Sequence, residues 1–181
     1  MIIEQQKLNV NGSEILLRCA NEDDAEMLLE NFKKVSGETP YLLLAPDEIN
    51  LTVEQEKRFI GINNSDGDKL LLLAFVDGRY AGNCSFAGKS ASRRQAHRAS
   101  FGIALLQEFT GRGLGGIMIE KLLCEAKRAG FEQMELEVYS ENVRARKLYK
   151  RLGFTECGRI PDAIKFPDGT AFDEIRMFKK L

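Results

Sequence analysis

The chain has 181 residues, of which 44% are hydrophobic and 29% charged, and 26 Lys and Arg against 27 Asp and Glu leave a formal net charge of −1. This balance lacks the basic excess of sequence-independent nucleic-acid binding, and no apolar run approaches the roughly 20 residues of a membrane-spanning helix. We therefore expect a cytoplasmic protein with no nucleic-acid and no membrane partner, organised as a single domain over residues 1–181.

The amino-terminal third predicts one strand and two helices. A strand is expected over Ser13–Arg18, and the apolar spacing after Asn21 predicts a helix that Gly37 ends. A second helix should begin at Thr52, because Thr52 and Gln55 form a capping-box pattern. We expect these helices to form a wall over whatever the sheet binds.

The middle of the chain predicts an antiparallel meander. Strands over Lys69–Val76 and Arg79–Ala87 are joined by Asp77 and Gly78, a dipeptide typical of a tight hairpin. A polar loop, Gly88–Gln95, then leads to a third strand near His97–Leu105.

The carboxyl-terminal part adds a helical crossover and a hairpin. A long helix that ends at Gly130 leads to a strand over Gln133–Val138, so the strands on either side of this helix should be parallel. A short helix begins at Asn142, and strands over Phe154–Phe166 and Thr170–Phe178 follow. The order predicts an α/β (α+β) fold with a mixed, mostly antiparallel central sheet of about seven strands and helices on both faces.

The cysteine and histidine inventory favours neither a zinc site nor a disulfide framework. Cys19, Cys84, Cys124 and Cys157 stand far apart, and His97 is the only histidine. We expect the cysteines to be small buried hydrophobes.

A glycine-rich turn precedes the long helix and consists of Gly111, Arg112, Gly113, Leu114, Gly115 and Gly116. Glycine lets the backbone approach a ligand closely, and the first amides of a helix have no intrahelical acceptor. With the positive end of the helix dipole, these amides predict a phosphate site suited to the pyrophosphate of a nucleotide-bearing cofactor.

Two other interpretations of this turn remain. Gly111, Gly113 and Gly116 match a Rossmann fingerprint, with Glu135 or Glu137 about 20 residues on. Against this, residues 106–110 separate the turn from its strand, and a hairpin stands where further βαβ units would be needed. The third interpretation is a glycine-rich connection that binds nothing.

Two segments resemble the GCN5-related N-acetyltransferases (GNAT). Residues 108–115 (EFTGRGLG) resemble motif A, which reads Gln or Arg, two residues, Gly, one residue, Gly or Ala. Residues 142–154 (NVRARKLYKRLGF) resemble motif B, and together with residues 136–138 (LEV) they are most similar to the ribosomal-protein N-terminal acetyltransferases. The sequence departs from motif A at Glu108, which weakens one polar contact near the phosphates.

This resemblance implies a GNAT-like acyl-CoA N-acyltransferase fold with acetyl-CoA as cosubstrate and no metal. It places the pyrophosphate on the turn amides and the pantetheine arm beside the end of the third strand, where a bulge should splay this strand from the next parallel one. The implied cofactor-binding residues are Ile103, Ala104, Leu105, Gly111, Arg112, Gly113, Leu114, Gly115, Gly116 and Asn142. Asn142 is alternatively only an N-cap, and Ile103 and Leu105 also suit the sheet core.

The resemblance also suggests residues for proton transfer. Glu137 is the candidate general base for an attacking amine, directly or through water, or else a solvated strand carboxylate. Tyr149 is the candidate general acid for the departing thiolate, or else a core residue. Asp173 is suggested instead by its phase with Ile175 and Met177 on the last expected strand, and is either an amine contact or an edge-strand charge. Direct attack in a ternary complex is favoured over a covalent cysteine route, because a reactive cysteine would need a nearby base.

The sequence thus predicts an acetyl-CoA-dependent N-acetyltransferase that acts on a primary amine, either a protein N-terminus or a small molecule. The alternative is a non-catalytic CoA-binding or sensing module, because Glu108 departs from the motif and the acceptor is unassigned. The acceptor's identity and the oligomeric state, including a homodimer, stay open.

Overall fold

A single mixed sheet organises the chain. The computed structural model describes residues 1–89 and 92–181, so positions 90 and 91 of the predicted loop after Gly88 lie outside it. Within these ranges the sheet has the strand order β1-β2-β3-β4-β5-β6-β8-β7. The strands are β1 (Gln6–Val10), β2 (Ser13–Cys19), β3 (Lys69–Val76), β4 (Arg79–Gly88), β5 (Arg98–Leu105), β6 (Gln133–Tyr139), β7 (Thr155–Lys165) and β8 (Ala171–Lys180).

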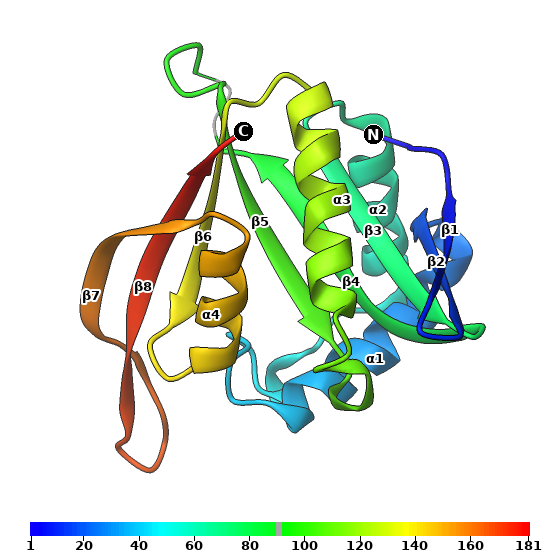
Figure 1. Cartoon of the computed structure of the whole chain (residues 1–181). Helices are drawn as coiled ribbons and strands as arrows, with labels where there is room; N and C mark the ends of the chain where they lie inside the picture. The colour runs from blue at the N-terminus through cyan, green and yellow to red at the C-terminus, as the bar shows by residue number, and fades with distance from the viewer. Residues whose placement is uncertain (90–91) are drawn as a thin grey trace.

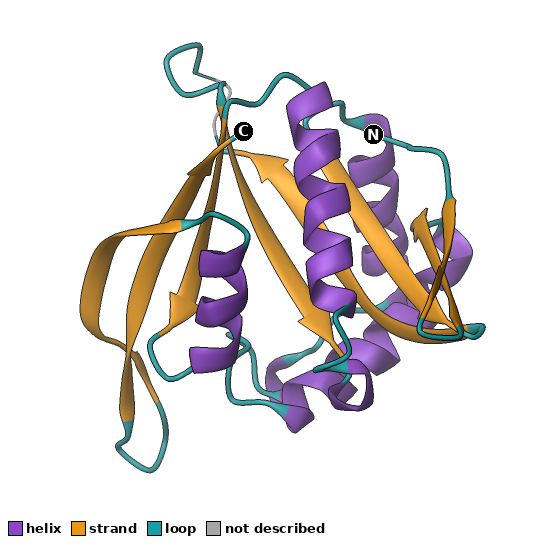
Figure 2. Cartoon of the chain, viewed as in Figure 1, coloured by secondary structure: helices purple, strands orange, loops and turns teal. Residues whose placement is uncertain are grey.

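Helices cover both faces of this sheet, as expected (Figure 2). They are α1 (Ala25–Glu38), α2 (Val53–Ser65), α3 (Leu114–Arg128) and α4 (Val143–Arg151), with short 3-10 turns at Glu22–Asp24, Pro46–Glu48 and Gln107–Phe109. Helices α3 and α4 lie on the near face in Figure 1, and α1 and α2 lie behind the sheet.

Strand β3 shows why both faces need a helical layer. Leu70 and Leu72 belong to the core cluster that also contains the buried face of α3. Leu71 and Leu73 point the other way and join a second cluster with residues of α1 and α2 such as Ile60. Because successive side chains of a strand alternate between faces, a continuous leucine run is buried only when both faces are covered.

The sheet opens between β5 and β6, its one parallel pair in the described residues. These strands pair only through Arg98–Ser100 and Gln133–Glu135. Beyond that point they diverge into a V, which is plain in Figure 1. On its other side β5 stays in register with β4 as far as Leu105. The edge of β5 that faces β6 therefore has no strand partner from position 101 to 105 in the described chain.

The expected bulge at the end of β5 is not present, because the β4 and β5 register is continuous through Leu105. The irregularity lies one strand away, where Ala74 pairs with Gly82 and Phe75 with Tyr80, which leaves one extra residue in β4. A Cβ atom on Gly82 would lie 2.3 Å from the carbonyl oxygen of Ala104. Only glycine therefore fits where the irregular part of β4 passes the end of β5.

Two expectations for the amino-terminal third were wrong. Strand β1 was not predicted, although Asn11 and Gly12 take positive φ angles of 52° and 86° and join it to β2 as a tight hairpin. Gly37 does not end α1, which continues to Glu38. The helix ends because Thr39 precedes a proline and is extended, with φ −148° and ψ 141°. The capping box of α2 is confirmed, since Thr52 accepts from the Gln55 amide and donates its own amide to the Gln55 side chain.

The cysteines are only partly buried. Cys84 is buried as expected, whereas Cys124 and Cys157 are exposed. Cys124 lies two residues from Leu122 and from Ala126, both of which face the core, so helical phase turns it outward. In residues 1–89 and 92–181 no group of three or more His, Cys, Asp or Glu side chains is placed to hold a metal ion. No helix in these ranges is long and apolar enough to span a bilayer.

Candidate active site

The glycine turn presents a row of free amides at the start of α3. Gly113 is the N-cap of this helix and takes a left-handed conformation with φ 86°, and Gly111 also has a positive φ of 80°. The amides of Gly116 and Ile117 donate to the Gly113 carbonyl at 3.0 and 3.3 Å. Within the described chain the amides from Gly111 to Gly115 donate to no protein acceptor, so they are available to an anion.

Glu108 has a structural role at the base of this turn. Its carboxylate lies 2.7 Å from Arg79 Nη2 and 3.7 Å from Lys34 Nζ, and so links the turn to β4 and α1. Arg79 also lies over the ring of Phe109, with its Cζ atom 5.4 Å from the ring centroid. The two cations offset the carboxylate's charge near the predicted phosphate site.

The end of β5 serves the core and leaves its backbone edge open. A Cβ atom on Gly115 would lie 3.4 Å from Leu105 Cδ1 and 3.8 Å from Ile103 Cδ1, so these side chains pack under the first turn of α3. The backbone of Ile103, Ala104 and Leu105 pairs with β4 and is unpaired toward β6. The core interpretation of Ile103 and Leu105 is confirmed, and it is compatible with the predicted cofactor contact because the side chains and the open backbone edge are separate surfaces.

Tyr149 is buried beside the V and is only 8% exposed. Its ring packs edge-on against Phe101 and Phe154, with centroids 5.7 and 6.1 Å away. Burial raises the pKa of the Tyr149 phenol to about 12, because the phenolate would lose its hydration. Its hydroxyl makes no hydrogen bond to another described residue. The phenol therefore keeps its proton at neutral pH.

Glu137 lies on the opposite face of the sheet from Tyr149. Its neighbours Leu136 and Val138 point into the core, so Glu137 faces the side of α1 and α2. Its side chain is 52% exposed, and the carboxylate lies 3.8 Å from Arg176 Nε, which also approaches Glu174 at 3.2 Å.

Glu135, two residues earlier, is held tightly. Its carboxylate accepts two hydrogen bonds from Arg98 and lies 3.1 Å from Lys89 Nζ. These partners, Arg98 foremost, lower the pKa of Glu135 to about 2. Because β5 and β6 pair at Ser100 and Glu135, this ion pair fixes the apex of the V, whereas Glu137 lies beyond the last paired residues, in the opening.

Two hollows meet on this face of the sheet. One of about 310 Å³ lies between the end of α2 and strands β4 and β5, and one of about 690 Å³ is lined by Glu137 and Arg176. Both are lined by Ser100 and Phe101, so they adjoin at the V. Glu137 therefore borders a hollow that continues past the V to the end of α2.

The two remaining candidates are placed as follows. Asn142 is the N-cap of α4, and its Oδ1 accepts from the Ala145 amide at 3.2 Å. Its Nδ2 donates no hydrogen bond in the described chain, so the N-cap role leaves this donor free. Asp173 binds Arg159 and accepts from the Asp162 amide at 2.9 Å, so it braces β7 against β8.

Two features of the site were not found from the sequence. Tyr41, in the loop after α1, packs against Tyr139 and Phe172 with ring centroids 6.4 Å away, and its hydroxyl donates to the Glu141 carbonyl at 3.2 Å. No local pattern signals a contact across 100 residues. The second feature is the set of five cations on α4, which is visible in the sequence but does not by itself indicate a role.

A comparison with known families decides what this geometry belongs to. Residues 29–154, more than half of the chain, match the model of the acetyltransferase (GNAT) family. The chain belongs to this family. The V between β5 and β6 and the glycine turn at α3 are thus features of a GNAT fold, as the two motifs predicted.

Individual relatives agree. A [ribosomal protein bS18]-alanine N-acetyltransferase of Haemophilus influenzae is 30% identical over 96 residues, which is 52% of this chain but only 62% of that relative. An acetyltransferase of the GNAT family from Streptococcus pneumoniae superposes with a TM-score of 0.87 at 28% identity over 92% of this chain and 99% of the other. The structure of yncA from Salmonella typhimurium, solved with acetyl-CoA, gives 0.80 at 20% identity over 92% and 94%.

Proposed function

We propose that this protein is an acetyl-CoA-dependent N-acetyltransferase, with residues 1–181 acting as one domain, that acetylates a primary amine by direct attack in a ternary complex. The observation that carries the proposal is the continuity between the free amides of Gly111–Gly115 and the open edge of β5. The amides suit a diphosphate, and an unpaired strand edge suits the two amides of a pantetheine arm as an added strand. Family membership and a neighbour solved with acetyl-CoA support this assignment.

The candidate catalytic side chains stand on either side of the V. Glu137 takes the proton of the attacking amine, directly or through water, as the bond from nitrogen to the acetyl carbon forms. Tyr149 gives its proton to the sulfur as the carbon–sulfur bond breaks, and Asn142 Nδ2 contacts the arm or an ordered water. An α-amine has a pKa of about 7.7 to 8.0, so part of it is neutral near pH 7 and a weak base suffices.

The acceptor is either a protein N-terminus or a small amine. The names of the curated relatives point to alanine-initiated protein termini, and the adjoining hollows beside Glu137 leave room for an extended acceptor. The non-catalytic alternative loses one of its two supports, because Glu108 is engaged by Arg79 and Lys34.

The test is acceptor-dependent release of free thiol from acetyl-CoA by the purified chain. The panel contains an alanine-initiated peptide, the same peptide with a blocked N-terminus, a lysine peptide and a polyamine. We expect thiol release and a product heavier by one acetyl group with at least one free amine, and none with the blocked peptide. Tight acetyl-CoA binding without turnover on any acceptor would instead support a CoA-sensing module.

A further inference from the structure

The cations of α4 divide into two groups with different surroundings. Arg146 and Lys150 both pair with Glu156, at 2.9 and 3.0 Å. Arg144, Lys147 and Arg151 have no carboxylate partner in the described chain and are exposed. On a helix, positions 144, 147, 148 and 151 share one side and positions 146 and 150 lie on another. One side of α4 therefore carries three cations that no described acidic group offsets.

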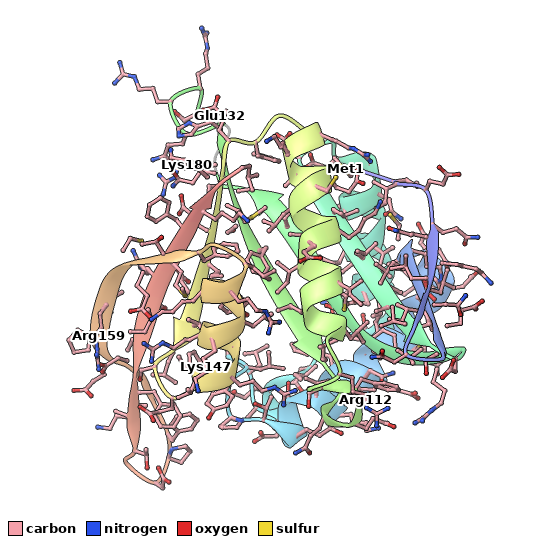
Figure 3. All side chains as sticks on the ribbon, viewed as in Figure 1. Met1, Arg112, Glu132, Lys147, Arg159 and Lys180 are labelled. Carbon is pink, nitrogen blue, oxygen red and sulfur yellow. The ribbon has the colours of Figure 1, made fainter. Side chains whose placement is uncertain are left out.

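This unpaired side faces the start of α3. A Cβ atom on Gly111 would lie 3.1 Å from Arg144 Nη2, so this guanidinium rests against the glycine turn. A Cβ atom on Gly116 would lie 3.8 Å both from Arg151 Nη2 and from Leu148 Cδ1. Arg144, Leu148 and Arg151 thus form a ridge that packs along the first turn of α3. Arg112 in the turn and Lys147 on α4 lie at the same end of the molecule (Figure 3).

We propose that Arg144 and Arg151 form a second anion-binding element beside the glycine turn, in which Arg144 engages the diphosphate of CoA and Arg151 its ribose 3′-phosphate. This inference rests on the proposed function, because it assigns the other side of the same cosubstrate site. Arginine side chains of α4 would then bind the CoA phosphates together with the backbone amides of motif A.

The separation of Arg144 and Arg151 explains why each is assigned to a different phosphate group. Arg144 and Arg151 are seven residues apart, or about 10 Å along the helix. The two guanidinium groups also lie against different glycines, Arg144 at Gly111 and Arg151 at Gly116, so they face different parts of the turn and helix. CoA carries two separate anionic groups, the diphosphate and the ribose phosphate. Arg144 lies against Gly111, the first of the free amides, which places it at the diphosphate and leaves the second anion to Arg151.

The planar guanidinium can bind a phosphate through two parallel hydrogen bonds. Five free amides alone would hold a diphosphate of any nucleotide with little regard to its sugar. An arginine placed for the ribose 3′-phosphate makes the site select CoA over the otherwise identical 3′-dephospho form.

The test compares two ligands on four proteins. Dissociation constants for acetyl-CoA and 3′-dephospho-acetyl-CoA are measured by calorimetry with the unmodified chain, R144A, R151A and K150A. We expect R144A to weaken both ligands about tenfold, since both carry the diphosphate. We expect R151A to weaken acetyl-CoA about tenfold and to leave the dephospho ligand unchanged. K150A, on the other side of the same helix, should bind both ligands normally.

Each other result has a defined meaning. Normal binding by both R144A and R151A would overturn the inference while leaving the proposed function intact. If R151A lost equal affinity for the two ligands, the assignment of Arg151 to the ribose phosphate would be overturned. If K150A lost as much affinity as R144A, the inference would be overturned too, because the losses would then reflect only the helix's overall positive charge. Failure of the unmodified chain to bind acetyl-CoA would refute the proposed function itself. Thermal melts of all four proteins show whether each remains folded.

Discussion

The two sides of the V are built differently. The side that faces the glycine turn consists of backbone amides, an open strand edge and two successive helices, α3 and α4. The side that faces Glu137 is assembled from distant segments, such as Tyr41 against Tyr139 and Phe172, and the end of α2 over β4 and β5. A site formed by backbone groups keeps its shape when nearby side chains are substituted. A site formed by side chains changes its shape with each substitution. The first side therefore suits a constant cosubstrate and the second a variable acceptor.

Removing the Tyr149 hydroxyl should lower turnover more than any other change to either side of the V. Tyr149→Phe keeps the ring that packs on Phe101 and Phe154 and removes only the proton donor. Turnover should fall by about 100-fold or more, with acetyl-CoA affinity unchanged, as measured by thiol release and calorimetry.

Tyr80→Phe is the matched control. Burial also raises the Tyr80 pKa to about 12, and its hydroxyl accepts from Asn83 on the side of α1 and α2. This variant should keep most of the turnover. Equal losses in the two variants, or normal turnover by Tyr149→Phe, would refute the general-acid assignment.

Substitutions at Glu137 and Glu135, two residues apart on β6, should have different effects: the first should lower turnover and the second stability. Glu137→Gln should lower turnover by about 10-fold to 100-fold with little loss of stability, because water can partly replace an exposed base. Glu135→Gln should instead lower the melting temperature, because it weakens the ion pairs with Arg98 and Lys89 at the apex of the V.

The pH dependence of stability adds a further check on Glu135. Its folded pKa of about 2 lies below the ordinary value near 4.5, so its contribution is present above pH 4.5 and is lost as the pH falls toward 2. The Glu135→Gln variant should lack this part of the acid destabilisation in thermal melts between pH 5 and pH 2. An unchanged acid profile would contradict the role of the apex ion pair.

A substitution that strains the glycine turn tests directly whether its backbone amides bind acetyl-CoA. Gly113→Ala should weaken acetyl-CoA binding about tenfold, because alanine disfavours φ 86° by roughly 1 kcal/mol and tilts the free amides. Gly130→Ala places the same strain at φ 93° beyond the far end of α3, and neither added methyl meets another atom within 4 Å. Both variants should lose similar stability in denaturant melts, and only Gly113→Ala should lose affinity.

Glu108→Gln should give the smallest effect. It installs a side chain usual in motif A and removes the ion pairs with Arg79 and Lys34, which are partly exposed. Stability should fall by less than about 1 kcal/mol, and acetyl-CoA affinity should stay within about twofold. A gain of tenfold or more would show that the carboxylate opposes phosphate binding after all.

The sequence predicted the local structure on the glycine-turn side of the V well because its signals are local. Gly111 and Gly113, the helix that follows, and Asn142 as an N-cap are all short patterns with a direct backbone meaning. The parallel pairing of β5 and β6 followed from the helix between them. The position of the β4 irregularity at Gly82 did not follow, since it depends on contact with Ala104 of another strand.

The side of the V that faces Glu137 could not be predicted in the same way. The pairing of Tyr41 with Glu141 joins segments whose proximity only the folded sheet creates. Asp173 and Arg159 meet inside the predicted carboxyl-terminal hairpin, but its irregular register does not follow from the sequence. Strand β1 is the exception, because the dipeptide Asn11-Gly12 between alternating apolar residues is a local signal that could have revealed it.

The most direct test of the central claim is an amide NMR titration of the glycine turn. The signals of Gly111, Gly113 and Gly115 are followed as acetyl-CoA is added, and again with S-acetylpantetheine, which has the arm and thioester but no diphosphate. We predict large shifts of these three amides with acetyl-CoA and small ones with S-acetylpantetheine. Saturation with acetyl-CoA that leaves the three signals in place would contradict the account.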